Sequence, residues 1–269
     1  MVSAILLQIY SKREARAFMP RSSSDKTQVM ALVSEVRAYC AANADAVNAI
    51  KYTRYFKEGY DAWGLLGNDH PLWTEMEPQW YQAHAQRGIS FFLNVGEELF
   101  RSGKYEEGSV AIRLLEHFVD QIDAPHILQL ALWFDGGIRN WAHTDVLCSE
   151  IVEPLLVSGV VSYEVLTPWR ESAHRYQRRA VPVAMLGLLK TDDRPVEPLL
   201  QFLRPLMVDP ERVVNQGLGW FLRETWKKWP DAVETLLSEF KDVAPRVIYQ
   251  YATEKMPPER KALFRRARR

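Results

Sequence analysis

Cysteine is scarce in this chain of 269 residues, which has only Cys40 and Cys148. The two cysteines lie far apart, and neither belongs to a pair with the spacing of a metal site or a redox motif. Chains without disulfide patterns are typical of reducing compartments. We therefore expect two buried free thiols in a cytoplasmic protein.

Long apolar runs are also missing. The run at residues 4–7 is soon followed by Lys12 and Arg13, and it is too short for a signal peptide or a membrane span. No later run reaches membrane length. The sequence therefore predicts a soluble protein with no membrane partner.

An excess of one charge is absent as well, because 34 Lys and Arg residues are balanced by 34 Asp and Glu residues. Binding to an anionic partner must then depend on the local distribution of charge. The histidines show no metal-ligand spacing, and no phosphate-binding loop, dinucleotide fingerprint or nucleophile motif occurs. We expect no metal and no cofactor.

Apolar residues are abundant, at 47% of the chain, and they recur at helical spacing almost from end to end. This is enough for a large core, and strand-like alternation is almost absent. The expected helices span residues 24–43, 45–59, 71–85, 89–101, 104–121, 125–139, 141–157, 162–190, 196–207, 209–229, 231–240 and 243–251.

A weak repeat runs through the middle of the chain. Small residues followed by a leucine-rich face begin at Gly108, Ala180 and Gly217, and with Asp145 included the offsets are 37 (145 − 108), 35 (180 − 145) and 37 (217 − 180). This is close to the period of helix-pair repeats of the HEAT and armadillo kind. The sequence predicts an all-α fold, a right-handed superhelical solenoid of HEAT-like helix pairs with a concave groove. We expect an N-terminal extension at 1–24, the repeat domain at 25–256 and a basic tail at 257–269.

Trp141 and Asp145 are the leading candidates for a working site, because residues four apart share one face of a helix. An indole ring beside a carboxylate can stabilise a positive charge. On the pattern alone, a core Trp and a capping Asp are the more common outcome. His143, between the two, is open to two interpretations: a general base, or the more frequent hydrogen-bonded structural histidine.

Further candidates fall at matching positions of the following repeats, where Arg178, Arg179 and Trp220 combine cations with an aromatic ring. Tyr55 and Lys57 offer a similar mixture near the N-terminus, and guanidinium groups suit phosphate. Two plainer interpretations remain open. Arginine clusters are usually solvated helix faces, and a Trp between apolar residues usually belongs to the core.

One segment carries a specific family resemblance. Residues 214–224 read Val-Asn-Gln-Gly-Leu-Gly-Trp-Phe-Leu-Arg-Glu and are followed by Trp-Pro-Asp at 229–231. They resemble the Gly-Trp-x-Leu-Arg-Glu helix and Asn-Pro-Asp turn of the DNA alkylation repair family, the HEAT-like DNA glycosylases of the AlkD group. The Trp141 to Asp145 spacing, Gln-Arg-Arg-Ala at 177–180 and Arg-Tyr-Phe-Lys at 54–57 match further family motifs. The resemblance covers residues 45–252.

The resemblance implies a role for each candidate. Asp145 would be the catalytic carboxylate, with Trp141 and Trp220 as aromatic walls around the damaged nucleotide. The implied DNA contacts are Arg179, with Arg178 as its fallback, and Tyr55. Lys57 is expected to join the two arginines in a local basic face that binds DNA.

The implied function is that of a monomeric DNA glycosylase in base excision repair. It would hydrolyse the N-glycosidic bond of cationic N3- or N7-alkylated purines in double-stranded DNA, in the cytoplasm and at the nucleoid. The competing interpretation is a non-catalytic helical-repeat protein, which either binds DNA structures or serves as a protein scaffold.

Overall fold

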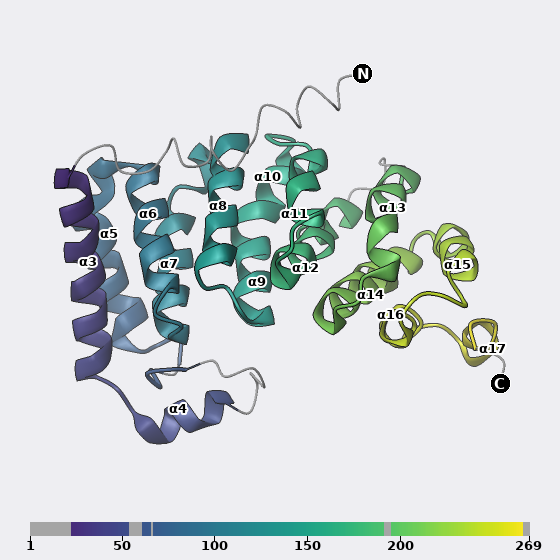
Figure 1. Ribbon diagram of the computed structural model, residues 1–269, viewed down its shortest axis with the longest axis horizontal. Coiled ribbons are helices and arrows are strands. Elements are labelled where there is room, and N and C mark those ends of the chain that lie inside the picture. Colours follow the sequence, from purple (N-terminus) through teal and green to yellow (C-terminus); the bar gives the residue numbers. More distant parts are fainter. Residues whose placement is uncertain (1–22, 54–60, 66, 191–194, 266–269) are drawn as a thin grey trace. The chain divides into compact units, whose positions relative to one another are not determined.

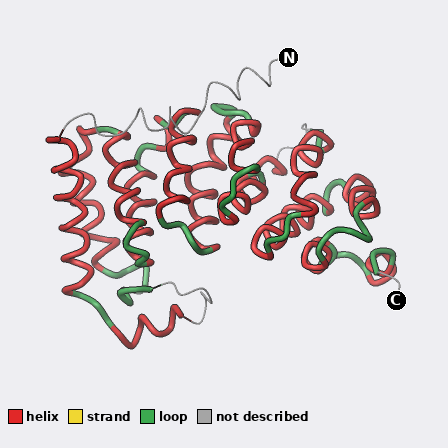
Figure 2. The backbone as a smooth tube through the Cα atoms, in the orientation of Figure 1, coloured by secondary structure: helices red, strands yellow, loops and turns green. Residues whose placement is uncertain are grey.

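The computed structural model describes residues 23–53, 61–65, 67–190 and 195–265, and this part of the chain consists of helices and loops (Figure 2). Those ranges contain no β-strand, only an isolated bridge between Asp61 and Lys104. The predicted all-α class is thereby confirmed. The predicted DNA contacts Tyr55 and Lys57 lie outside the described residues.

The chain divides into two compact units, unit 1 (Met1–Leu147) and unit 2 (Cys148–Arg269). No helix in the described ranges combines the length and the apolar character needed to cross a membrane. Cys40 and Cys148 are buried free thiols, as predicted, and burial raises the pKa of the Cys40 thiol to about 12. The two units are described separately below.

Most helices of unit 1 pack side by side in two rows, while α4 lies apart from them (Figure 1). Its elements are α3 (Ser23–Ala42), α4 (Ala46–Thr53), η2 (Leu72–Met76), α5 (Glu77–His84), η3 (Ala85–Arg87), α6 (Ile89–Phe100), α7 (Tyr105–Glu116), η4 (Val119–Gln121), α8 (Ala124–Gly136) and α9 (Trp141–Leu147). In one row α3 packs on α6 and α6 on α8, while in the other α5 packs on α7 and α7 on α9. The helices of these two rows therefore bury their apolar faces against their neighbours.

Unit 2 follows the same scheme. Its elements are η5 (Cys148–Val152), α10 (Glu153–Ser158), η6 (Tyr163–Leu166), α11 (Thr167–Arg170), α12 (Arg175–Ala184), η7 (Leu186–Lys190), α13 (Glu197–Leu203), η8 (Arg204–Val208), α14 (Arg212–Trp226), α15 (Pro230–Glu239), α16 (Arg246–Ala252) and α17 (Pro258–Ala262). The helices α12, α14 and α16 pack in succession, and α13 packs on α15. The last described residues also pack, because Phe264 is buried and its carbonyl accepts a hydrogen bond from Arg246.

The prediction of one helix over residues 162–190 is wrong. The chain leaves the helical path after Arg170 and resumes it at Arg175. In the intervening loop the Ser172 hydroxyl accepts from the backbone N–H of His174 and donates to Gln177. A serine side chain thus replaces the hydrogen bonds that a continuous helix would form. The predicted helix over 141–157 also changes type, to a π-helix at η5, before Pro154, which has no N–H to donate.

Two buried glutamates of α7 accept hydrogen bonds from the loop at residues 61–65. The Glu106 carboxylate is fully buried and accepts from the backbone N–H groups of Trp63, Gly64 and Leu65. Its neighbour Glu107 accepts from Arg37 Nε and from the indole N–H of Trp63. Gly64 has φ +87°, a left-handed conformation in which a side chain is strained. The loop at 61–65 is therefore anchored to α7.

The small residues of the repeat pattern lie where helices approach closely. A Cβ atom at Gly108 would lie 2.5 Å from Phe100 Cε1 and 2.6 Å from His143 Cε1. Gly108 thus lets α7 contact both α6 and α9. A larger residue at this position would push α9, the helix that carries Trp141 and Asp145, away from α7.

We expect Gly108→Ala to lower the free energy of unfolding by about 1–3 kcal/mol, because the added methyl group has no room. Gly136→Ala is the matched control, since a Cβ atom at Gly136 would have no neighbour closer than 3.8 Å. That variant should be neutral or more stable, because alanine restricts the unfolded chain. Urea denaturation of both variants measures the difference. Equal stability of the two would contradict the close packing at Gly108.

Candidate nucleic-acid interface

The helix α9 places Trp141 and Asp145 on its exposed side. Trp141 is 44% exposed, and Asp145, one turn later, is partly exposed. The residues between them, 142–144, are buried. The side chains of Trp141 and Asp145 therefore share one face, as i, i+4 spacing requires.

Asn140 fixes the point at which α9 begins. Its side-chain oxygen accepts from the backbone N–H of His143 at 2.7 Å, and its carbonyl accepts from the Thr144 hydroxyl at 2.8 Å. This is the usual capping role of asparagine at a helix N-terminus. Since Asn140 is itself buried, the cap holds the first turn, and with it Trp141, in a fixed position.

His143 is buried beneath this face as a neutral imidazole. Burial lowers its pKa to about 3. Its Nε2 atom lies 3.0 Å from the Tyr105 carbonyl, which can only accept, so we place the proton on Nε2. Nδ1 then accepts from the Asn140 amide at 3.2 Å, and the ring stacks on Tyr105 with centroids 4.5 Å apart. The structural interpretation of His143 therefore replaces that of a general base.

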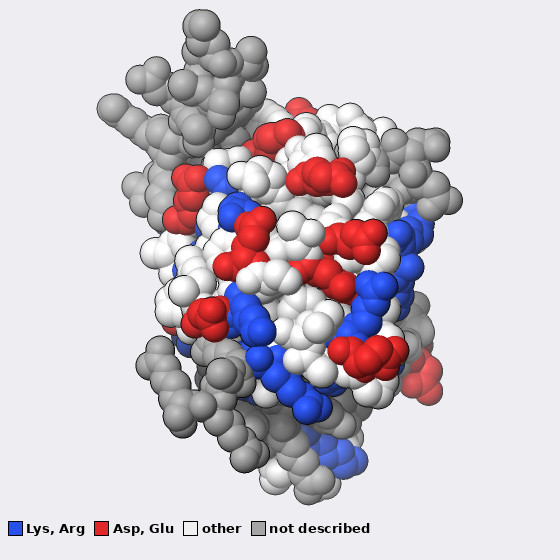
Figure 3. All heavy atoms as spheres, turned by 90° about the vertical axis from the view of Figure 1, so that its right-hand side faces the viewer, with Lys and Arg blue, Asp and Glu red and all other residues white. Residues whose placement is uncertain are grey.

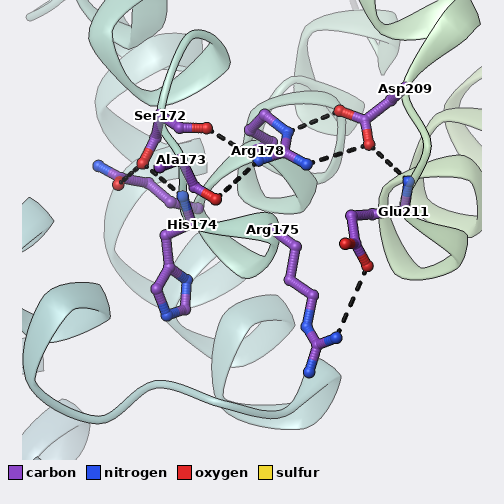
Figure 4. A network of polar contacts seen from close by, with 8 residues as sticks. Ser172, Ala173, His174, Arg175, Arg178, Asp209 and Glu211 are labelled. Atoms are coloured by element: carbon purple, nitrogen blue, oxygen red, sulfur yellow. Dashed lines mark hydrogen bonds and ion pairs between the residues drawn. The ribbon is translucent and has the colours of Figure 1, made fainter.

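In unit 2, Arg178 links the loops that precede α12 and α14 (Figure 4). Its Nε donates to Asp209 Oδ2 at 2.6 Å and its Nη2 to Asp209 Oδ1 at 3.1 Å. Its Nη1 donates to the carbonyls of Ser172 and Ala173, which precede α12. Asp209 Oδ1 also accepts from the backbone N–H of Glu211, just before α14. The guanidinium of Arg178 is thus used inside the protein and is not presented to a ligand.

Arg179 is buried between α12 and α14 and is only 6% exposed. Its Nη1 donates to the Val213 carbonyl at 2.9 Å, and its Cγ would lie 3.2 Å from a Cβ atom at Gly217. Trp220 follows Gly217 by three residues, so it lies on the same edge of α14. Arg179 thus packs against the turn of α14 that precedes Trp220, and Trp220 is partly exposed.

Many charged side chains of unit 2 form pairs of opposite charge. The exposed cations with acidic partners are Lys190 with Glu153, Arg204 with Glu239, Lys227 with Glu224, Lys255 with Glu254 and Arg260 with Glu234. On the face drawn in Figure 3, acidic and basic side chains lie interspersed. Since Arg178 and Arg179 are both drawn into the protein, they do not form the exposed basic face that the sequence suggested.

Sequence reasoning missed the other side chains that accompany Trp220 on α14. Gln216 and Arg223 lie within one turn of it, and Arg212 begins the same helix as an exposed residue. Their signal in the sequence is the spacing 212, 216, 220 and 223, which follows one helical stripe. Among the described residues, no group of three or more His, Cys, Asp and Glu side chains could hold a metal ion.

Rows of packed helices in each unit define an all-helical protein of the α-solenoid class. A family model for DNA alkylation repair enzymes matches residues 36–256. The chain belongs to this family, and membership supports a role in DNA repair with DNA as the partner.

A solved structure shares the fold. It is titled a predicted DNA alkylation repair enzyme from Enterococcus faecalis and matches with a TM-score of 0.66 at 15% sequence identity, over 80% of this chain and 98% of the other. At this identity the likeness concerns the fold alone. No curated protein matches the sequence significantly.

Proposed function

We propose that this protein is a DNA glycosylase that removes cationic N3- or N7-alkylated purines from double-stranded DNA, as the first step of base excision repair. The proposal rests chiefly on the exposed face of α9, where Trp141 and Asp145 stand above a buried and fully hydrogen-bonded layer. Membership of the DNA alkylation repair enzyme family supports it. In this proposal the helix pairs of both units are HEAT-like repeats, and the protein acts as a monomer.

The chemistry suits an ionised carboxylate without a general acid. Alkylation at N3 or N7 makes the purine cationic, so the bond from C1′ to the base breaks with its electron pair moving to the base, which leaves neutral. The sugar develops oxocarbenium character, and the oxygen of a water molecule bonds to C1′ while a proton passes to solvent. Asp145 would stabilise the developing cation and orient that water.

The aromatic and cationic residues would have supporting roles. The ring face of Trp141 attracts positive charge and excludes water beside Asp145. In unit 2, Trp220 is proposed as an aromatic contact to DNA. Arg179, the phosphate-binding cation that the family resemblance implies, is buried and donates to the Val213 carbonyl, so we assign it a supporting position beneath this surface. Arg178 is assigned a positioning role instead, because its guanidinium donors bind Asp209 and two loop carbonyls.

One observation favours the alternative of a non-catalytic binder or scaffold. Several exposed cations of unit 2 have acidic neighbours, which weakens a purely electrostatic attraction to DNA. Incubation of the protein with methylated duplex DNA separates the alternatives. A glycosylase releases free alkylated base, a DNA-structure binder binds the duplex without release, and a scaffold does neither. An unmethylated duplex of the same sequence serves as the control.

A further inference from the structure

Beside Trp220, a hydrogen-bonded pair of uncharged side chains joins two helices of unit 2. Gln216, one turn before Trp220 on α14, donates from Nε2 to the Tyr251 hydroxyl oxygen on α16 at 2.9 Å. Both side chains are partly exposed, as is Trp220. The residues at 216, 220 and 223 form one stripe of α14, so the pair lies on the same surface as the tryptophan.

The close approach of α16 to α14 makes this pair possible. A Cβ atom at Gly219 would lie 2.6 Å from Tyr251 Cβ and 2.9 Å from the Ile248 carbonyl oxygen. Only a residue without a side chain allows the Ile248 backbone and the Tyr251 Cβ atom to come so near. The tyrosine is thereby held against α14, and its hydroxyl reaches Gln216.

The hydrogen bond between the two leaves donors available. The Tyr251 oxygen accepts from Gln216, so the hydroxyl proton is not used in that bond, and the second amide proton of Gln216 also remains. No other hydrogen bond of these two groups occurs within the described residues. Two protons on partly exposed, mutually fixed groups can bind one acceptor with several lone pairs, and a phosphate oxygen is such an acceptor.

Arg223, the charged residue next to Trp220 on the same stripe, is already bound by carboxylates. Arg223 donates to Glu224 at 2.9 Å and to Glu254 at 2.7 Å, so two carboxylates compete with any phosphate for its guanidinium. The uncharged pair has no such competitor within the described residues. Near Trp220, neutral donors are therefore better placed than Arg223 to contact a phosphate.

We propose that Gln216 and Tyr251 form an uncharged phosphate-binding pair that contacts the DNA backbone next to Trp220. The inference rests on the proposed function for its partner, DNA. A phosphate contact made by this uncharged pair differs from one made by a basic residue in one measurable property. A lysine or arginine that binds phosphate releases condensed counterions, whereas a neutral donor does not.

The test measures the dissociation constant of a duplex oligonucleotide over a range of salt concentrations. Gln216→Leu and Tyr251→Phe should each weaken binding by about three- to tenfold, the usual effect of one lost hydrogen bond, without changing the salt slope. The double variant should lose less than the product of the single losses, because the two side chains act as a pair. Helical circular dichroism and melting temperature verify that each variant is folded.

Two further variants calibrate the result. Gln201→Leu makes the same amide-to-aliphatic change at an exposed position of α13 and should bind like the wild type. Arg212→Gln removes an exposed charge from the stripe, and if it contacts phosphate the slope should fall by about one. The proposal is overturned if Gln216→Leu and Tyr251→Phe bind within twofold of Gln201→Leu, or if either changes the slope.

The two proposals fail in different ways. If the wild type releases alkylated base while the Gln216 and Tyr251 variants bind normally, the glycosylase assignment stands and the phosphate-binding pair is wrong. If those variants bind weakly with unchanged slope but no base is released, the pair stands and the glycosylase assignment is wrong. A wild-type protein that binds no DNA overturns both.

Discussion

Replacing Asp145 with asparagine is expected to slow the release of an alkylated base by about a hundredfold or more, the scale of losing one preorganised transition-state contact. Asparagine keeps the size of the side chain and some of its hydrogen bonding but removes the negative charge. Because the positive charge on the sugar develops only as the base departs, affinity for the DNA should remain nearly unchanged. Single-turnover release of 7-methylguanine measures the effect.

Two controls make this experiment specific. Asp120→Asn changes an exposed carboxylate outside α9 and should leave the rate unaltered. His143→Asn tests the competing general base, and since the imidazole is buried we expect it to reduce stability rather than the rate per folded molecule. A large rate loss in His143→Asn with full activity in Asp145→Asn would remove the proposed mechanism.

The largest stability effect is expected at Arg178. Arg178→Ala should lower the free energy of unfolding by about 3–5 kcal/mol, the usual result of removing one partner from a buried ion pair. The Asp209 side chain is only 5% exposed and would be left without its cation, as would two loop carbonyls. Urea denaturation of the wild type and the variant gives the difference.

The same network contains a matched control in Arg175. Its Nη1 atom lies 3.6 Å from Glu211 Oε2 (Figure 4), and the two side chains are 39% and 40% exposed. Arg175→Ala should therefore cost less than about 1 kcal/mol. The double variant Arg178→Met, Asp209→Leu should recover part of the loss, because it leaves neither charge unpaired. An Arg178→Ala protein of wild-type stability with a reduced salt slope for DNA binding would identify Arg178 as a DNA contact after all.

Most of the fold could be predicted from helical periodicity. The spacing of apolar residues predicted the all-α class and most helix positions, because a helix of this kind must bury one face. It failed at residues 171–174, where a continuous helix was expected. There the break depends on the Ser172 hydroxyl and on Arg178, whose partner Asp209 is distant in the sequence. A window of one helix contains no information about that partner.

The candidate site shows the same limit. The shared face of Trp141 and Asp145 follows from local spacing alone. By contrast, Arg178 and Arg179 are adjacent, and only the packing of α12 against α14 decides that Arg178 binds Asp209 while Arg179 binds the Val213 carbonyl. The burial of Glu106 is equally hidden, because its three N–H donors come from a loop more than forty residues earlier. Tyr251 could not be predicted as a candidate from the sequence, because its proposed role depends on a hydrogen bond with Gln216 in another helix.

The central claim is that this chain cleaves the bond between an alkylated purine and its sugar. The most direct measurement is single-turnover incubation with a duplex that contains one 7-methylguanine, with the products identified by mass spectrometry. The account predicts free 7-methylguanine and a matching abasic strand, formed well above the spontaneous rate by the wild type and much more slowly by Asp145→Asn. Release no faster than in buffer alone, from a protein that binds the duplex, would contradict it.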